Sequence, residues 1–173
     1  KDKASFGTSN PPGKVMALAY KSAAGLDSAV EVQYRTSFDT ANDLASGALD
    51  FSGYDPVYAM NMAREGKLRI LAISTAQRLE FAPDLPTLKE QGIDVVVTSW
   101  QGLFAPAKTP DAILDKIEAA TKKGMTDPKW EAALTRDGLE MPPERTRAQF
   151  AKFVADEHNF WGRKLKELKI EME

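Results

Sequence analysis

The sequence has no cysteine and only one histidine among its 173 residues. Without cysteine the chain can form no disulfide, no thiolate metal site and no thiol nucleophile, and such chains suit an oxidising compartment such as the periplasm. No stretch approaches the roughly 20 apolar residues that a membrane-spanning helix needs, and no apolar core of a signal peptide is present. Because the first residue is Lys1 rather than methionine, we expect a processed or truncated product.

Recognisable catalytic motifs are absent as well. The sequence contains no HExxH, GxSxG, GxGxxG or P-loop pattern. Its histidine, His158, stands beside Asp156 and Glu157 in a helical pattern, and a solvent-facing position on that helix explains it better than catalysis. The net charge of −2 argues against a nucleic-acid partner, which usually meets a basic face. The sequence therefore offers no recognisable catalytic set.

What is present is an ordinary globular composition, with 43% hydrophobic and 28% charged residues, which excludes a disordered or fibrous chain. A chain of this length forms one large domain or two small lobes. It can bury roughly 70% of its unfolded surface, so it needs neither a metal nor a disulfide to be stable.

Strand-like and helix-like patterns alternate along the first part of the chain. Alternating or short apolar runs predict strands, and apolar residues every three to four positions predict helices. The predicted strands are residues 3–8, 30–34, 48–51 and 68–74, and the predicted helices are residues 15–24, a helix ending at 45, and 56–65. Such alternation implies right-handed crossovers and a largely parallel sheet in an α/β fold.

The composition changes near residues 98–106, which we expect to be a boundary between two lobes. Strand-like runs lie on either side of it, at residues 95–97 and 102–106. Beyond it, helix starts are predicted at Pro110-Asp111, Asp127-Pro128 and Thr146, with a short strand at residues 139–141. The aromatic residues of this part are expected to be core rather than ligand contacts; they are Trp100, Phe150, Phe153, Phe160 and Trp161.

Three strand-to-helix turns carry residues suited to binding an anion. In a parallel sheet these turns meet at the carboxyl ends of the strands, where backbone N–H groups and helix dipoles favour a carboxylate or a phosphate. The predicted ligand-binding residues are Thr8, Ser9, Asn10, Tyr34, Arg35, Thr36, Ser37, Tyr54 and Asp55. The same residues also make ordinary helix caps and turns, so the residues alone leave both interpretations open.

A longer series of residues resembles the signature of a transport family. Leu71-Ala72-Ile73-Ser74 and Arg78 are followed by Pro83-Asp84-Leu85-Pro86-Thr87-Leu88, Glu90 and Gly92, and then by Trp100, Gly102, Ala105-Pro106 and Thr109-Pro110. This series resembles the tripartite tricarboxylate transporter substrate-binding proteins, also called the Bug or TctC family of periplasmic solute receptors. Weaker agreement extends over nearly the whole chain.

The resemblance implies a type II periplasmic-binding-protein-like α/β fold, with a mostly parallel sheet flanked by helices. Residues 1–98 would form the second lobe. Residues 99–173 would form the crossover strand and the carboxy-terminal helices of the first lobe, whose amino-terminal half is absent. The implied function is non-catalytic capture of a small organic carboxylate by hinge closure. The resemblance also implies transmembrane permease subunits as partners, a periplasmic location, and no metal or organic cofactor.

Two departures from the family pattern fall in the presumed ligand loops. Thr36-Ser37 replaces a pair of glycines, and Asn10-Pro11-Pro12-Gly13 replaces a run rich in glycine and serine. The identity of the ligand therefore does not transfer from the family.

Three other interpretations stay open. The chain could be an α/β enzyme with an unrecognised catalytic set, or the ligand-sensing domain of a regulator. It could also be a folding fragment that cannot bind a ligand. This last interpretation predicts exposed apolar surface along residues 113–117 and 150–161, and dimerisation through the incomplete lobe.

Overall fold

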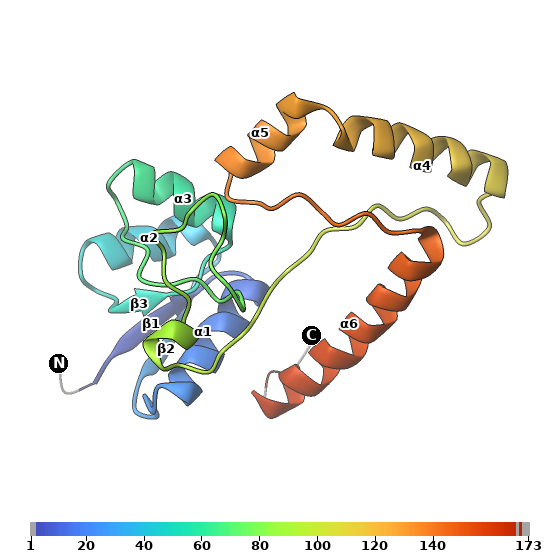
Figure 1. Cartoon of the computed structure of the whole chain (residues 1–173). Helices are drawn as coiled ribbons and strands as arrows, with labels where there is room; N and C mark the ends of the chain where they lie inside the picture. Colours follow the sequence, from blue (N-terminus) through green and yellow to red (C-terminus); the bar gives the residue numbers. More distant parts are fainter. Residues whose placement is uncertain (1–2, 169, 171–173) are drawn as a thin grey trace.

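The computed structural model describes residues 3–168 and residue 170. It contains a parallel three-stranded sheet of order β2-β1-β3, formed by β1 (Ser5–Thr8), β2 (Val30–Gln33) and β3 (Phe51–Ser52). Helices α1 (Pro11–Ala23), α2 (Ser37–Ala45) and α3 (Pro56–Arg64) follow the strands in turn. The predicted alternation and the parallel sheet are confirmed (Figure 1).

Helices cover both faces of the central strand β1. Phe6 is fully buried and stacks on Phe51, in a cluster that includes Ala17 of α1. The next residue, Gly7, faces the opposite side, because successive side chains of a strand point to opposite faces. There a Cβ atom would overlap the side chain of Thr40 in α2. The sheet therefore lies between α1 and α2, and both helices start at the same edge of it.

Local side chains determine where these helices begin. Asn10, Thr36 and Asp55 are N-caps whose side-chain oxygens each accept a backbone N–H three residues later, and such a cap contributes about 1 kcal/mol. Helix α1 starts at Pro11 rather than at the predicted Val15, because proline suits the first helical position after the cap. The segment 11–13, predicted as loop, is therefore the first turn of α1.

The apolar runs after α3 do not form sheet strands, and this part of the prediction is wrong. Within the described residues, one isolated bridge joins Ile73 to Thr87. The predicted strands at residues 68–74, 95–97, 102–106 and 139–141 are not strands, although the Val97 N–H donates to the Ser74 carbonyl at 3.0 Å. Val95 and Val97 are instead buried against α1. These two residues are apolar because they pack on a helix, whereas a strand needs a repeated ladder of backbone hydrogen bonds rather than a single one.

The residues of the family-like signature hold one another in place. Arg78 donates from Nε to the Glu90 carboxylate at 2.9 Å and from Nη1 to the Pro83 carbonyl at 2.7 Å. Glu90 also accepts the backbone N–H of Thr87 at 2.8 Å, and its own N–H donates to Thr87 Oγ1 at 3.1 Å. The pKa of Glu90 is lowered, most strongly by the hydrogen bond from the Thr87 N–H and next by the hydrogen bond from Arg78. The signature thus braces a loop that ends in the short 3-10 helix η1 (Lys89–Gln91).

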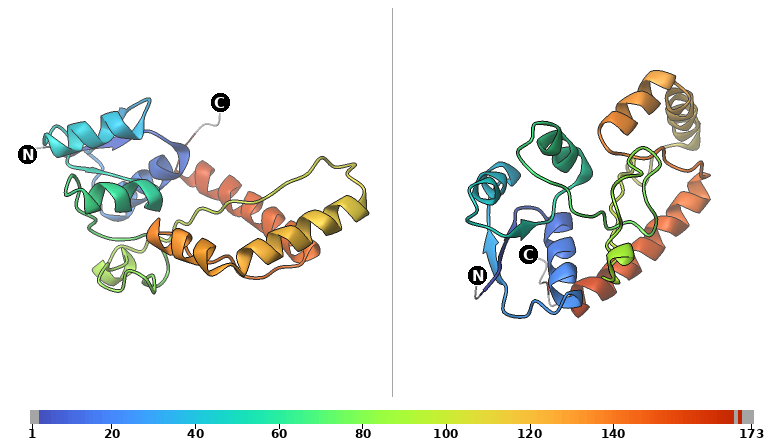
Figure 2. Two further views of the ribbon diagram at one scale, coloured as in Figure 1. Left: turned by 90° about the horizontal axis from the view of Figure 1, so that it is seen from above. Right: turned by 60° about the vertical axis from the view of Figure 1, so that its left-hand side comes forward.

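The rest of the chain is helical. It contains α4 (Asp111–Met125), α5 (Pro128–Arg136) and α6 (Arg147–Glu167), and all three helix starts are confirmed. We call residues 3–97 the sheet half and residues 98–168 the helical half. Extended chain joins the two, and α6 returns from the far end of α4 towards α1 (Figure 2).

The helical half buries little of its surface. Helices α4, α5 and α6 contain no buried residue. Leu103 and Phe104 are 68% and 64% exposed, and Ile113 and Ile117 of α4 are 48% and 39% exposed. The apolar exposure predicted at residues 113–117 is therefore present, whereas within 150–161 it is confined largely to Phe160, because the other aromatic rings are partly buried. Among the described residues, no helix combines the length and apolar character needed to cross a membrane.

Candidate ligand-binding site

The three predicted turns, which are residues 7–10, 34–37 and 52–55 in chain order, meet at the carboxyl edge of the sheet. Because β1, β2 and β3 run parallel, the chain leaves all three strands on the same side. There the Oγ atoms of Ser9 and Ser37 lie 3.0 Å apart, and Asn10 Nδ2 donates to Ser37 Oγ at 3.4 Å. The first turns of α1 and α2 therefore face each other across hydrogen-bonding side chains.

Thr8 supports this edge from below. It is 3% exposed, and its hydroxyl donates to Glu31 Oε1 at 2.7 Å. The same Glu31 oxygen lies 3.2 Å from Lys14 Nζ. Burial raises the pKa of Glu31, but the contacts with Thr8 and Lys14 outweigh burial and lower it overall. Because the Thr8 hydroxyl donates its hydrogen bond to Glu31, it can interact with a ligand only as a hydrogen-bond acceptor.

Three further predicted residues hold the helices in place. Tyr34 donates its hydroxyl to Asp43 at 2.6 Å, and this hydrogen bond raises the pKa of Tyr34 to about 12. Thr36 and Asp55 are the caps of α2 and α3. Arg35, in contrast, is exposed and has no hydrogen bond or ion pair with any described residue. Its charge is therefore available to attract an anion.

Two tyrosines lie beside the third turn. The ring centroids of Tyr54 and Tyr58 are 5.3 Å apart. Both hydroxyl oxygens are buried, and neither has a hydrogen-bond partner of good geometry among the described residues. Burial raises the pKa of both, although the nearby Ser52 hydroxyl partly offsets this for Tyr54. The sequence prediction missed Tyr58. Its spacing of four residues after Tyr54, at the start of a helix, is the signal that would have found it.

Gly13 and Gly53 bring α1 against the third turn, and they too were missed. A Cβ atom on Gly13 would overlap the carbonyl oxygen of Gly53, and one on Gly53 would lie 2.5 Å from the carbonyl oxygen of Gly13. Two backbones approach this closely only where both residues lack a side chain. The pair therefore fixes the spacing between the first and third turns.

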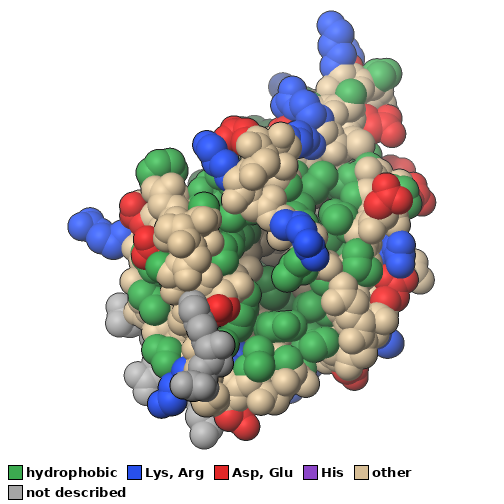
Figure 3. Space-filling model, turned by 90° about the vertical axis from the view of Figure 1, so that its left-hand side faces the viewer, with side chains coloured by type: hydrophobic (Ala, Val, Ile, Leu, Met, Phe, Trp, Pro, Cys, Tyr) green, Lys and Arg blue, Asp and Glu red, His purple; other side chains and the backbone are tan. Residues whose placement is uncertain are grey.

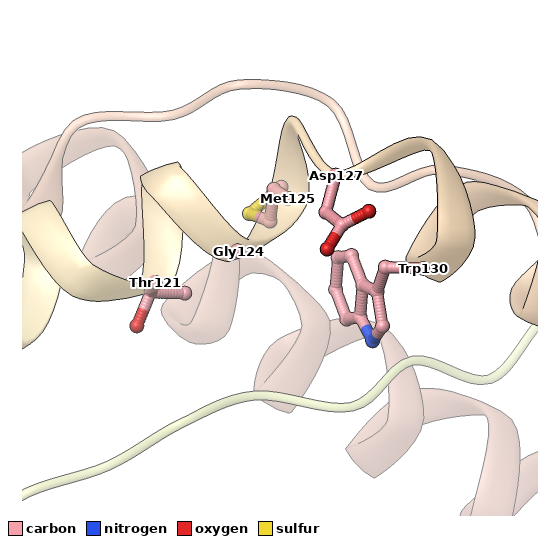
Figure 4. Close-up of a pocket in the computed structure, with 5 residues that line it drawn as sticks. All are labelled: Thr121, Gly124, Met125, Asp127 and Trp130. Atoms are coloured by element: carbon pink, nitrogen blue, oxygen red, sulfur yellow. The ribbon is translucent and has the colours of Figure 1, made fainter.

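The surface offers two other features near or beyond this edge. On the sheet side, the molecule is hollowed in its middle, and hydrophobic side chains gather around the hollow (Figure 3). A separate hollow of about 330 Å³ lies where α4 meets α5 (Figure 4). Its lining residues are Thr121, Gly124, Met125, Asp127 and Trp130. None of them belongs to the three turns.

The described part of the chain contains no candidate metal site, and its histidine lies away from the three turns. Across residues 3–168 and residue 170, no group of three or more histidine, cysteine, aspartate or glutamate side chains could hold a metal ion. His158 is exposed on α6, as predicted. What the three turns offer is a set of hydroxyls, an amide, helix N-termini and the exposed cationic side chain of Arg35, which is chemistry suited to binding an anion.

Comparison with known proteins places this geometry in context. The family described as tripartite tricarboxylate transporter family receptor matches residues 2–170. A protein of Cupriavidus necator, the UPF0065 protein in the gbd 5′ region, is 33% identical over 125 residues, which are 72% of this chain and 38% of that protein.

Two solved structures share the fold. MatC from Rhodopseudomonas palustris with bound malate is 25% identical, with a TM-score of 0.78 over 94% of this chain and 56% of that one. An R. palustris protein with adipate is 23% identical, with a TM-score of 0.84 over 96% of this chain and 56% of that one, and this identity supports the fold alone.

The chain thus spans little more than half the length of the solved structures and less than half of the curated relative. The predicted fold class is confirmed, and the matching family is one of receptors, which agrees with the prediction that the chain is not an enzyme. Since the family match covers nearly all of its residues, the chain belongs to the tripartite tricarboxylate transporter receptor family.

Proposed function

We propose that this chain takes part in the capture of a small carboxylate-bearing solute in the periplasm, for delivery to the transmembrane permease of a secondary tripartite transporter. The observation that carries the proposal is the meeting of the α1 and α2 starts at Ser9 and Ser37, 3.0 Å apart between hydroxyl oxygens. MatC from Rhodopseudomonas palustris, which is 25% identical to this chain and shares its fold, has malate bound, a small carboxylate.

The chemistry at this edge suits a carboxylate. Helix N-termini carry about half a positive charge and present unpaired backbone N–H groups. The Ser9 and Ser37 hydroxyls can rotate their hydrogens towards an oxygen anion, and the Asn10 Nδ2 group is a further donor beside them. Arg35 adds attraction at longer range. Thr8, Tyr34, Thr36 and Asp55 hold the turns in place rather than being free to bind. Tyr54 supplies an apolar wall for the carbon skeleton of the solute.

Capture would proceed by hinge closure without catalysis and without a metal or organic cofactor. In this proposal residues 1–98 act as the second lobe, and residues 99–173 belong to the first. The extended chain that joins the halves would then bend as the cleft closes. If the first lobe is incomplete, the exposed Ile113 and Ile117 are the surface through which two chains would associate.

A thermal-shift screen tests the proposal, with malate, adipate, a tricarboxylate and an aromatic acid as probes. A ligand at 100 times its dissociation constant should stabilise the protein by about 2.7 kcal/mol. The variants Ser9→Ala and Ser37→Ala should lose most of that shift, whereas Ser28→Ala, in an exposed turn away from this edge, should keep it. The absence of a shift with every acid would contradict carboxylate capture by this chain.

A further inference from the structure

Helix α6 touches both halves of the molecule. Near its start, Phe150 and Phe153 pack around Trp100, with ring centroids 6.0 Å and 5.2 Å from that of the indole. Near its end, Trp161 packs against the buried cluster of the sheet half, which includes Val97. Helix α6, itself part of the helical half, therefore packs at its end on the sheet half and near its start on the segment where the chain passes from one half to the other.

The carboxylate of Glu157 lies between these two contacts. Its Oε2 atom accepts the Nε1–H of Trp100 at 2.9 Å and the Nε1–H of Trp161 at 3.1 Å. Hydrogen bonds to a charged acceptor are roughly twice as strong as neutral ones, and partial burial of both limits competition from water. A single oxygen thus ties the crossing segment at Trp100 to the indole that is anchored in the sheet half.

We propose that Glu157 is a positioning residue that sets the angle between the sheet half and the helical half through its hydrogen bonds to Trp100 and Trp161. The apolar contacts of α6, which include Leu165 and Leu168 against the sheet-half cluster, define this angle less sharply than directed bonds do, because ring pairs tolerate several offset and tilted arrangements. An N–H···O bond requires its donor to point at the acceptor. Two such bonds to one oxygen therefore fix the orientation of both indoles.

The angle bears on the candidate ligand site because the helical half returns to α3. Arg64 of α3 donates to the carbonyl oxygen of Arg136, and a Cβ atom on Gly138 would lie 3.3 Å from the carbonyl oxygen of Pro56. Pro56 is the first residue of α3, directly after the third turn. A change of angle would therefore shift residues against this turn. This consequence for binding rests on the proposed function, whereas the positioning role itself does not.

The neighbouring residue provides a matched control. Asp156 forms its ion pair with Lys152 at 2.7 Å, with 62% of its side chain exposed, whereas the acceptor of both indole N–H groups is Glu157. The variant Asp156→Asn removes the same charge from the same helix as Glu157→Gln. The two variants therefore differ in whether the indole hydrogen bonds are affected.

Pulsed electron paramagnetic resonance measures the angle directly. Because the chain has no cysteine, spin labels can be attached at Ser22→Cys in α1 and Lys116→Cys in α4, both of which are exposed. We expect one narrow distance distribution in the unsubstituted background and in Asp156→Asn. The distribution should broaden and shift in Glu157→Ala, and to a smaller extent in Glu157→Gln, while the circular dichroism spectrum keeps its helical content. A distribution that stays unchanged in both Glu157 variants would overturn the proposal.

Tryptophan emission provides a second readout that needs no label. In a Trp130→Phe background the emission comes from Trp100 and Trp161 alone, since the chain has three tryptophans. We expect a red shift in Glu157→Gln, which retains an uncharged acceptor and tests the role even if Glu157→Ala fails to fold. No shift relative to Asp156→Asn would count against the paired hydrogen bonds.

Malate binding separates the two proposals. If the unsubstituted protein binds malate, the Glu157 variants should bind it several-fold more weakly although Ser9 and Ser37 are intact. If it binds no acid but the label distances change, the positioning role stands and the proposed function fails. If it binds and the Glu157 variants match it in both affinity and distance, the proposed function stands and the positioning role fails.

Discussion

The sheet half and the helical half of this molecule are stabilised by different means. In the sheet half, Phe6, Val15 and Val97 are almost completely buried, and a close backbone contact between Gly13 and Gly53 completes the packing. In the helical half, no residue of α4, α5 or α6 is buried. Aromatic contacts around Trp100 and exposed ion pairs of Arg147 connect its helices instead.

This difference shows where the geometry of the candidate site comes from. The three turns are fixed mainly by caps and close packing inside the sheet half, and the helical half touches them only beside the third turn, through its contacts with α3. The orientation of the helical half depends on the packing of the end of α6 against the sheet half and on a few directional contacts. The proposed hinge closure would require rigid turns and a second part that changes its orientation.

Replacement of a large buried side chain should show the largest contrast between the halves. Phe6→Ala removes a fully buried ring and should lower the free energy of unfolding by about 3–5 kcal/mol. Phe160→Ala on α6, where the side chain is 36% exposed, should change it by about 0.5 kcal/mol or less. Urea unfolding measures both. Equal losses would show that the helical half is packed as tightly as the sheet half.

Adding one methyl group should act with opposite sign in the two halves. Gly13→Ala forces a Cβ atom against the Gly53 carbonyl and should destabilise the protein by about 1–3 kcal/mol. Gly124→Ala, in α4, meets nothing within 4 Å and should stabilise by up to about 1 kcal/mol, since glycine is a poor helix former. Melting temperatures provide the test, and a loss in both variants would contradict the open packing of α4.

The ion pairs of the helical half should contribute less, and their contribution should depend on salt. Arg147 lies 2.6 Å from Asp115 and 3.3 Å from Glu118, with 47% of its side chain exposed. Arg147→Ala should therefore cost about 1 kcal/mol or less, and the loss should shrink at high salt because exposed charges are screened. The control is Arg163→Ala on α6, which removes a charge outside this network. A salt-independent loss would mean that Arg147 acts through packing.

The smallest effect should be a change in stability at high pH. The hydrogen bond to Asp43 raises the pKa of Tyr34 to about 12, above the ordinary value of about 10 for the unfolded chain. The protonated phenol is thus favoured in the folded state. Its contribution to stability is complete below pH of about 10 and is lost as the pH rises towards about 12. Unfolding measured across this range should show a shallower decline for Tyr34→Phe, and identical profiles would exclude the Tyr34–Asp43 bond as a source.

Features that depend on nearby residues could be predicted from the sequence. The caps at Asn10, Thr36 and Asp55 are local signals, and the parallel sheet followed from the strand–helix alternation. The convergence of Ser9 with Ser37 then followed from the sheet, because parallel strands bring their following turns to one edge. The family resemblance also covered the region that the structure shows to be a braced loop, held by Arg78 and Glu90.

Features that depend on distant partners could not be predicted. The apolar run at residues 68–74 has the pattern of a strand, but periodicity cannot tell whether a neighbouring strand is present. The contact of Gly13 with Gly53 and the buried hydroxyl of Tyr58 depend on how α1 and α3 meet the sheet. Glu157 was seen in the sequence only as a charged neighbour of His158. Its two indole partners, one of them far away in the chain, appear only in the fold.

The central claim is that a carboxylate binds where the three turns meet. The most direct measurement is a titration of the isotopically labelled chain with malate, followed through the backbone amide signals in nuclear magnetic resonance spectra. We predict that the largest shifts arise from residues 9–13, 35–39 and 53–56, and that Ser37→Ala weakens all of them together. Shifts confined to the hollow lined by Met125 and Trp130, or no shifts at all with any of the acids, would contradict it.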